Sequence, residues 1–448
     1  MRTGQARSGF VSPLTCAHFD ARKCIALINM ASDDLLKHVL LDLISTARPI
    51  TEVRLSALSD ADWQSLCMIA KQHRIGPMLH HRLQVLELGS SVPPNVTDQW
   101  ARAYRKAAFR YLSFRKTLAR LKEILDAAHI PFAALKGAWL SQYAYDNPVL
   151  RPLRDIDILV EPESALSVYA LLEKNGFVRR EDFPMPLDGA MDYAKHLPPM
   201  RYTETGIYLE VHSRLMDVPP GPTLTGALDD VSLLLGRCEN RDGVSYLSPT
   251  DTLLHLIVHA AYDHQFNNGP LTFNDIAFLL ETAVVDWPTF WTMAEAGNWV
   301  RGCIMILELA SYYHGADAWR AFYHGSLPAP STYQLESAAL LSLQEYDHRG
   351  LVGFKAAIAD ERGWSGQTGS IVNRIFPPLH RLAAFSGAPM ASYWALLHYP
   401  RWLAVQMHRL LFAKVDAGVM QDVDRAKDVR RWMYGDSSAV RAVHHDIL

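Results

Sequence analysis

The sequence Asp155-Ile-Asp-Ile-Leu-Val160 is the stretch that decides the fold. Acidic and aliphatic residues alternate at first, and the end is wholly apolar, which is typical of a β-strand with one end at a polar cleft. Because the side chains of a strand alternate between faces, Asp155 and Asp157 lie on the same face. Two carboxylates this close repel each other, and burial raises the cost, so the pair favours a site for a cation. Mg²⁺ is usually held by one or two carboxylates, water and substrate phosphates.

The segments on both sides of this strand predict an α+β unit in the order strand, helix, strand, helix, hairpin. We expect further strands at 130–135, 200–203 and 207–214 and helices at 138–145 and 162–175. The last two strands are separated by Glu204-Thr205-Gly206, which is a tight-turn signal.

Two more parts of the unit carry chemical groups. Glu210 lies in the strand at 207–214, and if that strand neighbours the first, Glu210 faces the aspartates and completes a triad. Lys136-Gly137 ends one strand and begins a helix, where free amide groups attract anions. Gly137 lets the backbone approach a ligand, and Lys136 can reach phosphate oxygens. A phosphate-binding turn beside an acidic metal site is what nucleotidyl transfer needs.

Each motif is weak alone, since an Asp pair at a strand end is more often a solvated turn, but their order is specific. Leu135-Lys136-Gly137, Arg151-Pro-Leu-Arg154 running into 155–160, and Leu209-Glu210-Val-His212 resemble the uncharacterised nucleotidyltransferase family of the polymerase-β-like superfamily. Fainter resemblance at 63–83 and 248–259 extends the coverage to about residues 60 to 300. The resemblance implies that Asp155 and Asp157 are metal ligands. It also implies that Glu210 holds the catalytic metal or takes the acceptor's proton.

The same resemblance implies a fold and an organisation. The fold is α+β, a polymerase-β-like core of a small mixed sheet with helices, flanked by N- and C-terminal helical regions. We expect a loose tail at 1–31, a helical region at 32–128, the nucleotidyltransferase core at 129–248, a helical region lining the cleft at 249–325 and a C-terminal helical region at 326–448.

The sequence departs from the wider superfamily at two places. Lys136-Gly137 replaces the usual Gly-Ser motif, and Arg154 occupies a position that is usually small. Arg154 either binds phosphate or pairs with the aspartates and hinders metal binding. Arg151 either contacts phosphate or braces its loop through a carboxylate. His212 shares a strand face with Glu210, as an orienting residue, a base or an interior histidine.

Composition limits the remaining possibilities. The 448 residues are 49% hydrophobic and carry a net charge of −3, so no global positive charge draws the chain to nucleic acid. Five cysteines without a CxxC pair argue against a disulfide framework and favour a reducing, cytoplasmic compartment. The first thirty residues have no apolar run of signal-peptide length.

For three further features of the sequence we favour a structural role over a binding function. Residues Asp251, His255, His259 and Asp263 form a helical stripe that lines the cleft more plausibly than it binds zinc. The basic helix at 98–128 suits a solvated face better than RNA. The uncharged segment 382–400 fits a buried helix better than a membrane or partner surface, because its glycine and prolines suit a bilayer poorly.

The sequence therefore predicts an enzyme that needs Mg²⁺ or Mn²⁺ and transfers an NMP from an NTP. The acceptor is open between a small molecule, a peptide or protein, and an RNA end, and no stable membrane insertion is expected. Besides Asp155, Asp157 and Glu210, the predicted nucleotide-binding residues are Lys136, Gly137, Arg151, Arg154 and His212. The alternative is a catalytically inactive nucleotide-binding or scaffold protein on the same fold, with Arg154 as an internal cation.

Overall fold

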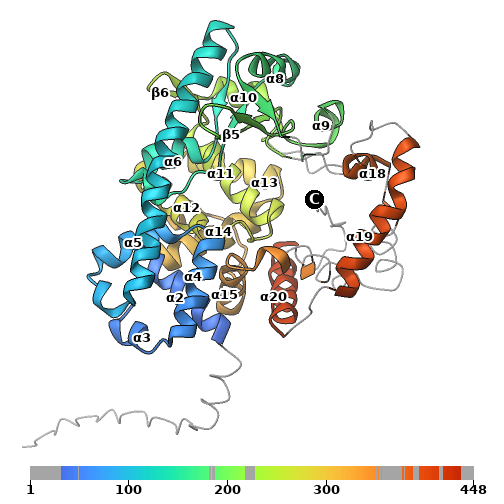
Figure 1. Ribbon diagram of the computed structural model, residues 1–448. Coiled ribbons are helices and arrows are strands. Elements are labelled where there is room, and N and C mark those ends of the chain that lie inside the picture. The colour runs from blue at the N-terminus through green and yellow to red at the C-terminus, as the bar shows by residue number, and fades with distance from the viewer. Residues whose placement is uncertain are drawn as a thin grey trace, which may run out of the picture.

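The computed structural model describes most of the chain (Figure 1). The described residues are 32–48, 50–180, 183, 187–216, 228–348, 351–352, 355, 376–377, 379–386, 393–412 and 417–434. The tail expected at 1–31 lies outside them.

Helices form the N-terminal part, as the sequence predicts. They are α2 (Ser32–Ile44), α3 (Glu52–Ser56), α4 (Asp60–Gln72), α5 (Gly76–Val85), the short η1 (Gly89–Ser91) and the long α6 (Pro94–Ala127). Ser59 caps α4 in a capping box with Asp62, which satisfies amide groups that the first turn leaves open. Beyond α4 the chain turns at Arg74, which has a left-handed φ of 58°. Helix α6 then runs past α5 towards the sheet (Figure 1).

A seven-stranded mixed sheet follows, in the order β3-β4-β5-β2-β1-β7-β6. Its strands are β1 (Ala133–Ala134), β2 (Asp155–Leu159), β3 (Phe177–Arg179), β4 (Met200–Tyr202), β5 (Tyr208–His212), β6 (Glu239–Arg241) and β7 (Val244–Tyr246). The hairpin of β4 and β5 closes at Gly206, whose φ of 71° suits glycine. The prediction of an α+β core with a small mixed sheet is confirmed, although sequence analysis missed β3, β6 and β7.

Short helices connect the strands of this sheet. They are α7 (Gly137–Trp139), the π-helical η2 (Leu140–Ala144), η3 (Pro148–Leu150), η4 (Pro162–Ser164), α8 (Ala165–Lys174), α9 (Leu187–Tyr193) and α10 (Val231–Gly236). α8 occupies the predicted range 162–175 together with η4, and it ends before Gly176, where φ is 89°.

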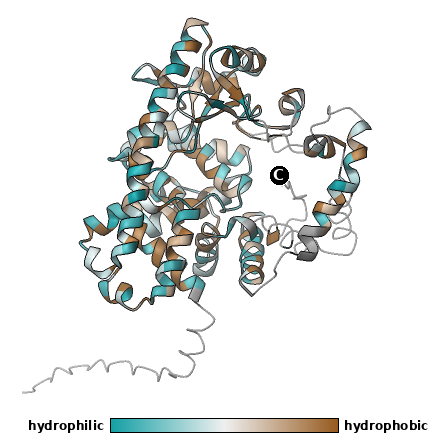
Figure 2. Cartoon of the chain, viewed as in Figure 1, coloured by the Kyte–Doolittle hydropathy of each residue, from teal (hydrophilic) through white to brown (hydrophobic). Residues whose placement is uncertain are grey.

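The rest of the described chain is helical. Its elements are α11 (Pro249–Val258), η5 (His259–Asp263), α12 (Leu271–Thr282), α13 (Trp287–Ala296), α14 (Val300–His314), η6 (Ala318–Phe322), α15 (Thr332–Leu341), η7 (Tyr346–His348), α18 (Leu379–Ser386), η8 (Tyr393–His398), α19 (Tyr399–Phe412) and α20 (Ala417–Tyr434). Hydrophobic and hydrophilic residues alternate along most helices, as expected when one face is buried (Figure 2). One hydrophobic core extends from Leu36 to Met433 and includes the inner residues of the sheet.

The uncharged segment 382–400 is not the buried helix that its composition favours. Its described residues fall into parts of α18, η8 and α19, and Tyr393 and Leu397 are exposed. Residues near Gly387 and Pro389 are not described. Within the described parts of the chain, no helix combines the length and apolar character needed to cross a bilayer.

Hydrogen bonds join the N-terminal helices to α14. The chain directly after α2 forms two hydrogen bonds to the carbonyl of Tyr313 near the end of α14. The Ser45 hydroxyl donates one, and the amide of Ala47 donates the other at 3.0 Å. Thr46 Oγ1 lies 3.1 Å from His314 Nδ1. Burial, aided by the positive charge of Arg82, lowers the pKa of His314 to about 3. The folded protein therefore keeps this imidazole neutral in acid that would protonate it in the unfolded chain.

We predict that His314→Leu makes stability less sensitive to acid. An unfolded histidine has a pKa of about 6.5, so between that pH and about 3 the unfolded chain binds a proton that folded His314 does not. Wild-type stability therefore falls as pH falls through this window. From pH 7 to pH 5 the variant should lose about 2 kcal/mol less than the wild type in urea unfolding. The exposed His129, changed to Asn, is the control, and equal pH dependence in all three proteins would contradict the prediction.

Candidate active site

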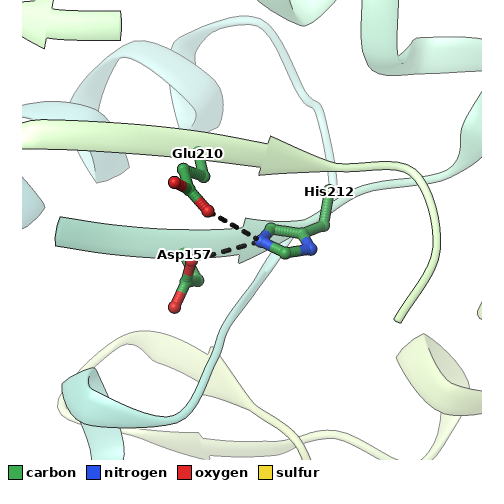
Figure 3. Close-up of side chains that lie close together, drawn as sticks. All are labelled: Asp157, Glu210 and His212. Carbon is green, nitrogen blue, oxygen red and sulfur yellow. Dashed lines mark hydrogen bonds and ion pairs between the residues drawn. The ribbon is translucent and has the colours of Figure 1, made fainter. Parts of the chain in front are cut away.

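The parallel pairing of β2 with β5 brings the predicted acids together. In this register Asp157 lies opposite Glu210, and Leu159 lies opposite His212. Since side chains alternate along each strand, Asp155, Asp157, Glu210 and His212 share one face. A ligand atom from each of Asp157, Glu210 and His212 fits within 4.8 Å of the others. Asp157 thus meets Glu210 and His212, which lie more than 50 residues further along the chain (Figure 3).

His212 links the two carboxylates. Its Nε2 lies 3.1 Å from Asp157 Oδ1 and 3.7 Å from Glu210 Oε2 (Figure 3). Burial opposes protonation of the ring, but the hydrogen bonds to Asp157 and Glu210 outweigh it and raise the pKa of His212. The other nitrogen, Nδ1, is buried and has no hydrogen-bond partner among the described residues. The arrangement fits a proton on Nε2, donated to the carboxylates.

The three carboxylates do not share their negative charge equally. Burial, together with the charges of Asp157 and Glu210, raises the pKa of Asp155 to about 7. Burial would also raise the pKa of Asp157, but Lys136 and the hydrogen bond from His212 hold it well below its usual range. For Glu210 the hydrogen bond from His212 and the charge of His196 outweigh burial, so its pKa is lowered. The site therefore holds two ionised carboxylates and a third, Asp155, that keeps its proton up to about neutral pH.

This donor set fits a divalent cation. Carboxylate oxygens are the ligands that Mg²⁺ prefers, and a cation would relieve the repulsion between the acids. The His212 imidazole can take part as a ligand for Mn²⁺ or as a hydrogen-bond donor to the ligating carboxylates. To bind a metal through Nε2 it must first lose the proton on that atom. Among the described residues there is no other cluster of three or more His, Cys, Asp or Glu that could hold a metal. The stripe from Asp251 to Asp263 therefore forms no zinc site there.

Lys136 lies next to these acids at the start of α7. Its Nζ is 3.7 Å from Asp157 Oδ2, and its backbone has a left-handed φ of 44°, which is uncommon for a residue with a side chain. The turn holds Lys136 because the amide of Leu135 donates to the Asp157 carbonyl at 2.9 Å, and the amide of Leu140 to the Lys136 carbonyl at 3.0 Å. The lysine therefore belongs to the acidic cluster through both backbone and side chain.

Gly137 is required by its packing. A Cβ at this position would lie 2.5 Å from Arg151 Nη1 and 2.9 Å from Leu153 Cδ2. The amide of Ala138 already donates to the carbonyl of Leu135 at 3.1 Å. The turn is therefore less open than the row of free amide groups expected from the sequence, and an arginine fills the space that the glycine leaves.

Arg151 braces its loop through a carboxylate, which is one of the two roles that the sequence predicts. Its Nε and Nη2 donate to the two carboxylate oxygens of Asp275 in α12 at 2.8 and 2.9 Å. The hydroxyl of Tyr145 donates to the same carboxylate at 2.7 Å. The bidentate pair of Arg151 and Asp275 ties the loop before β2 to the helical region that follows the sheet.

Arg154 is exposed beside the first aspartate. Within the part of the chain that the structure describes, it forms no ion pair with Asp155 or Asp157. The Arg110 side chain of α6 donates to the backbone carbonyls of Leu153 and Arg154. Arg110 therefore holds the backbone directly before β2, where Arg154 lies. Part of the basic face of α6 thus has a structural role in positioning the site.

The stripe on α11 and η5 divides into two groups. Asp251 binds Arg237 at 2.6 Å, away from the carboxylates. Burial, with the nearby charge of Lys136, holds the pKa of both His255 and His259 well below the usual range. These neutral imidazoles lie close enough to Lys136 to be affected by its charge, and that they line a cleft stays a prediction.

Sequence analysis missed three residues near the acids. His196 Nε2 lies 3.6 Å from Glu210 Oε2, and the neighbouring Lys195 donates to Asp263 at 2.8 Å. Arg74 is the third: burial and the charge of Arg154 lower its pKa, while Asp155 opposes the shift. The resemblance at 63–83 includes Arg74, but only the fold brings it towards Asp155. Lys195-His196 precedes a strand and carries no motif signal.

The fold and this geometry together define a class: an α+β protein with the nucleotidyltransferase core that the resemblance implies. Residues 59–315 match the family described as uncharacterised nucleotidyltransferase. Because the match covers more than half of the chain, the protein belongs to that family. No curated protein and no solved structure matches the chain.

We predict that Asp275→Ala destabilises the protein by about 3–5 kcal/mol, because it leaves the guanidinium of Arg151 buried without its partner. Combining Asp275→Leu with Arg151→Met removes both charges and should recover much of the loss. Denaturant unfolding measures both. Glu123→Ala, which removes the exposed partner of Arg120 within helix α6, is the control and should change stability by about 0.5 kcal/mol or less. Equal losses at Asp275 and Glu123 would contradict the brace.

Proposed function

We propose that this protein is a metal-dependent nucleotidyltransferase that transfers an NMP from an NTP to an acceptor. Membership of the family supports transfer of a nucleotide group. The observation that carries the proposal is the cross-strand pair of Asp157 and Glu210, with Asp155 on the same face. A buried group of like charges is costly, and a divalent cation with a triphosphate is the ligand that would repay that cost.

In this proposal Asp155, Asp157 and Glu210 hold Mg²⁺ or Mn²⁺, and His212 orients Asp157 and Glu210. A divalent cation bound there would neutralise the triphosphate and stabilise pyrophosphate as it leaves. Lys136 would move from Asp157 to a phosphate oxygen, since a flexible ammonium can exchange one anion for another. An acceptor oxygen or nitrogen would attack the α-phosphorus, the bond to the β-phosphate would break, and the acceptor's proton would pass to a carboxylate or to water.

Arg151, Gly137 and Arg154 have different parts in this proposal. Arg151 and Gly137 fix the turn that presents Lys136, so their contribution to nucleotide binding is indirect. Arg154 is exposed next to Asp155 and remains our candidate for a direct phosphate contact. The acceptor stays open between a small molecule, a peptide or protein, and an RNA end, and the cytoplasmic location stays a prediction.

A second candidate is the inactive nucleotide-binding protein. The observation that favours it is the positive charge already present in the site: Lys136 lies 3.7 Å from Asp157, and His212 lies between Asp157 and Glu210. These two groups, rather than Arg154, would replace the metal as internal cations. The two candidates differ in whether pyrophosphate is released.

We predict that the protein releases pyrophosphate from at least one labelled NTP in Mg²⁺ or Mn²⁺, and that Asp157→Asn or Glu210→Gln strongly slows the release. A catalytic metal contributes several kcal/mol, so loss of a ligand should lower the rate by about a thousandfold. Glu204→Gln is the matched control, because Glu204 is an exposed acid in the turn before β5 that pairs with Lys116.

Two outcomes would contradict the enzyme. One is the absence of pyrophosphate release with every NTP when cell extract is added as a source of acceptors. The other is NTP binding that neither metal nor the two substitutions alter, which is the behaviour of the inactive alternative.

A further inference from the structure

The C-terminal part of the chain, beyond the region that matches the family, has an unusual charge pattern. Residues 362–415 contain no Asp and no Glu, although the whole chain has more acidic than basic residues. The basic residues of this segment are Arg362, Arg374, Arg381, Arg401, Arg409 and Lys414. A positive segment in an acidic chain attracts polyanions locally, whatever the net charge of the protein.

The described part of this segment forms a small unit of its own. α18, η8 and α19 pack around Leu382, Ala383 and Ala395, a core separate from that of the main body. Tyr399 and Trp402 pack against it. α19 stands apart from the main helical body (Figure 1).

Large apolar side chains of this unit point to solvent. In η8, Tyr393 is 75% exposed, Leu396 50% and Leu397 68%, and Trp394 is also largely exposed. They lie within one short helix, directly before the exposed Arg401 of α19. Exposed apolar residues gathered in this way, unlike single ones, indicate a surface that contacts a partner.

The chemistry of this surface favours one partner. Tyr and Trp suit the interface of a bilayer, Leu suits the acyl boundary, and an exposed Arg in a segment whose sequence has no acids suits anionic headgroups. Single-stranded nucleic acid would match the charge and the aromatic rings, but the aliphatic Leu396 and Leu397 have no base to stack on. A protein partner would not require that the whole segment lack acids. The described helices are too short and polar to cross a membrane, so the contact would be peripheral.

We propose that η8 and the start of α19 dock onto the surface of an anionic lipid bilayer, with Tyr393, Leu396 and Leu397 in the headgroup layer and Arg401 at lipid phosphates. This interaction is independent of the proposed nucleotidyl transfer.

Flotation of the full-length protein with vesicles tests the proposal. The protein should float with phosphatidylcholine vesicles that contain phosphatidylglycerol and stay behind with phosphatidylcholine alone, and added NaCl should weaken the binding. Leu397→Asp should lower the partition coefficient about tenfold, because it places a charge where the proposed contact would bury an exposed leucine in the headgroup layer. Arg401→Glu should lower it about tenfold or more, because it reverses a charge at an anionic surface.

Matched variants separate these effects from general ones. Val284→Asp adds the same charge at a 90% exposed residue of the main body, and Lys174→Glu makes the same reversal on α8; both should float like the wild type. Circular dichroism checks that every variant is folded.

Three results would overturn the proposal. The first is equal partition to both kinds of vesicle or none to either. The second is a mobility shift of single-stranded RNA that Leu397→Asp and Arg401→Glu abolish while vesicle binding is absent. The third is a dimer in light scattering that Leu397→Asp dissociates, which would assign the surface to a second copy of the chain.

Discussion

The parallel pairing of β2 with β5 is the constraint on which the candidate site depends. The side chains of a strand return to the same face every two residues. The observed register of β2 and β5 therefore places Asp157 beside Glu210, and a slip of one residue would turn Glu210 to the other face. The alternating aliphatic residues secure that register, since Ile156, Ile158 and Leu209 are fully buried on the opposite face. The packing of an ordinary hydrophobic core thus fixes the position of charged groups that would otherwise repel each other.

The acidic cluster is surrounded by the positive Lys136 and by histidines, and contacts with other parts of the chain hold these groups in place. Lys136 is presented by a turn that Gly137 and Arg151 fill, and Arg151 is in turn held by Asp275 from a helix beyond the sheet. His212 bridges two carboxylates, while burial keeps the histidines of the facing helix neutral. Removal of one group therefore changes the charge state of several others, and the helical region after the sheet contributes directly to the geometry of the turn.

Sequence analysis succeeded where a local pattern has one structural meaning. The alternating run at 155–160, the turn at 204–206 and the order of strands and helices around them gave the α+β class and the pairing of β4 with β5. It failed where position depends on distant contacts. β3, β6 and β7 are three residues long and carry little pattern, and the apolar composition of 382–400 did not reveal that Tyr393 and Leu397 are exposed. Burial is a property of the neighbours of a residue, and those neighbours lie elsewhere in the chain.

The sequence by itself determined the family, the class of fold and the residues that form the acidic cluster, because motif order and strand periodicity are local properties. Only the tertiary structure decided which of these residues touch one another. It assigned Arg151 to Asp275 and inserted His212 between two carboxylates. It also brought Arg74 towards Asp155, His196 towards Glu210 and Lys195 to Asp263. The physical reason is that ion pairs and pKa shifts depend on distances and burial across strands and helices, which the spacing of residues along a chain does not specify.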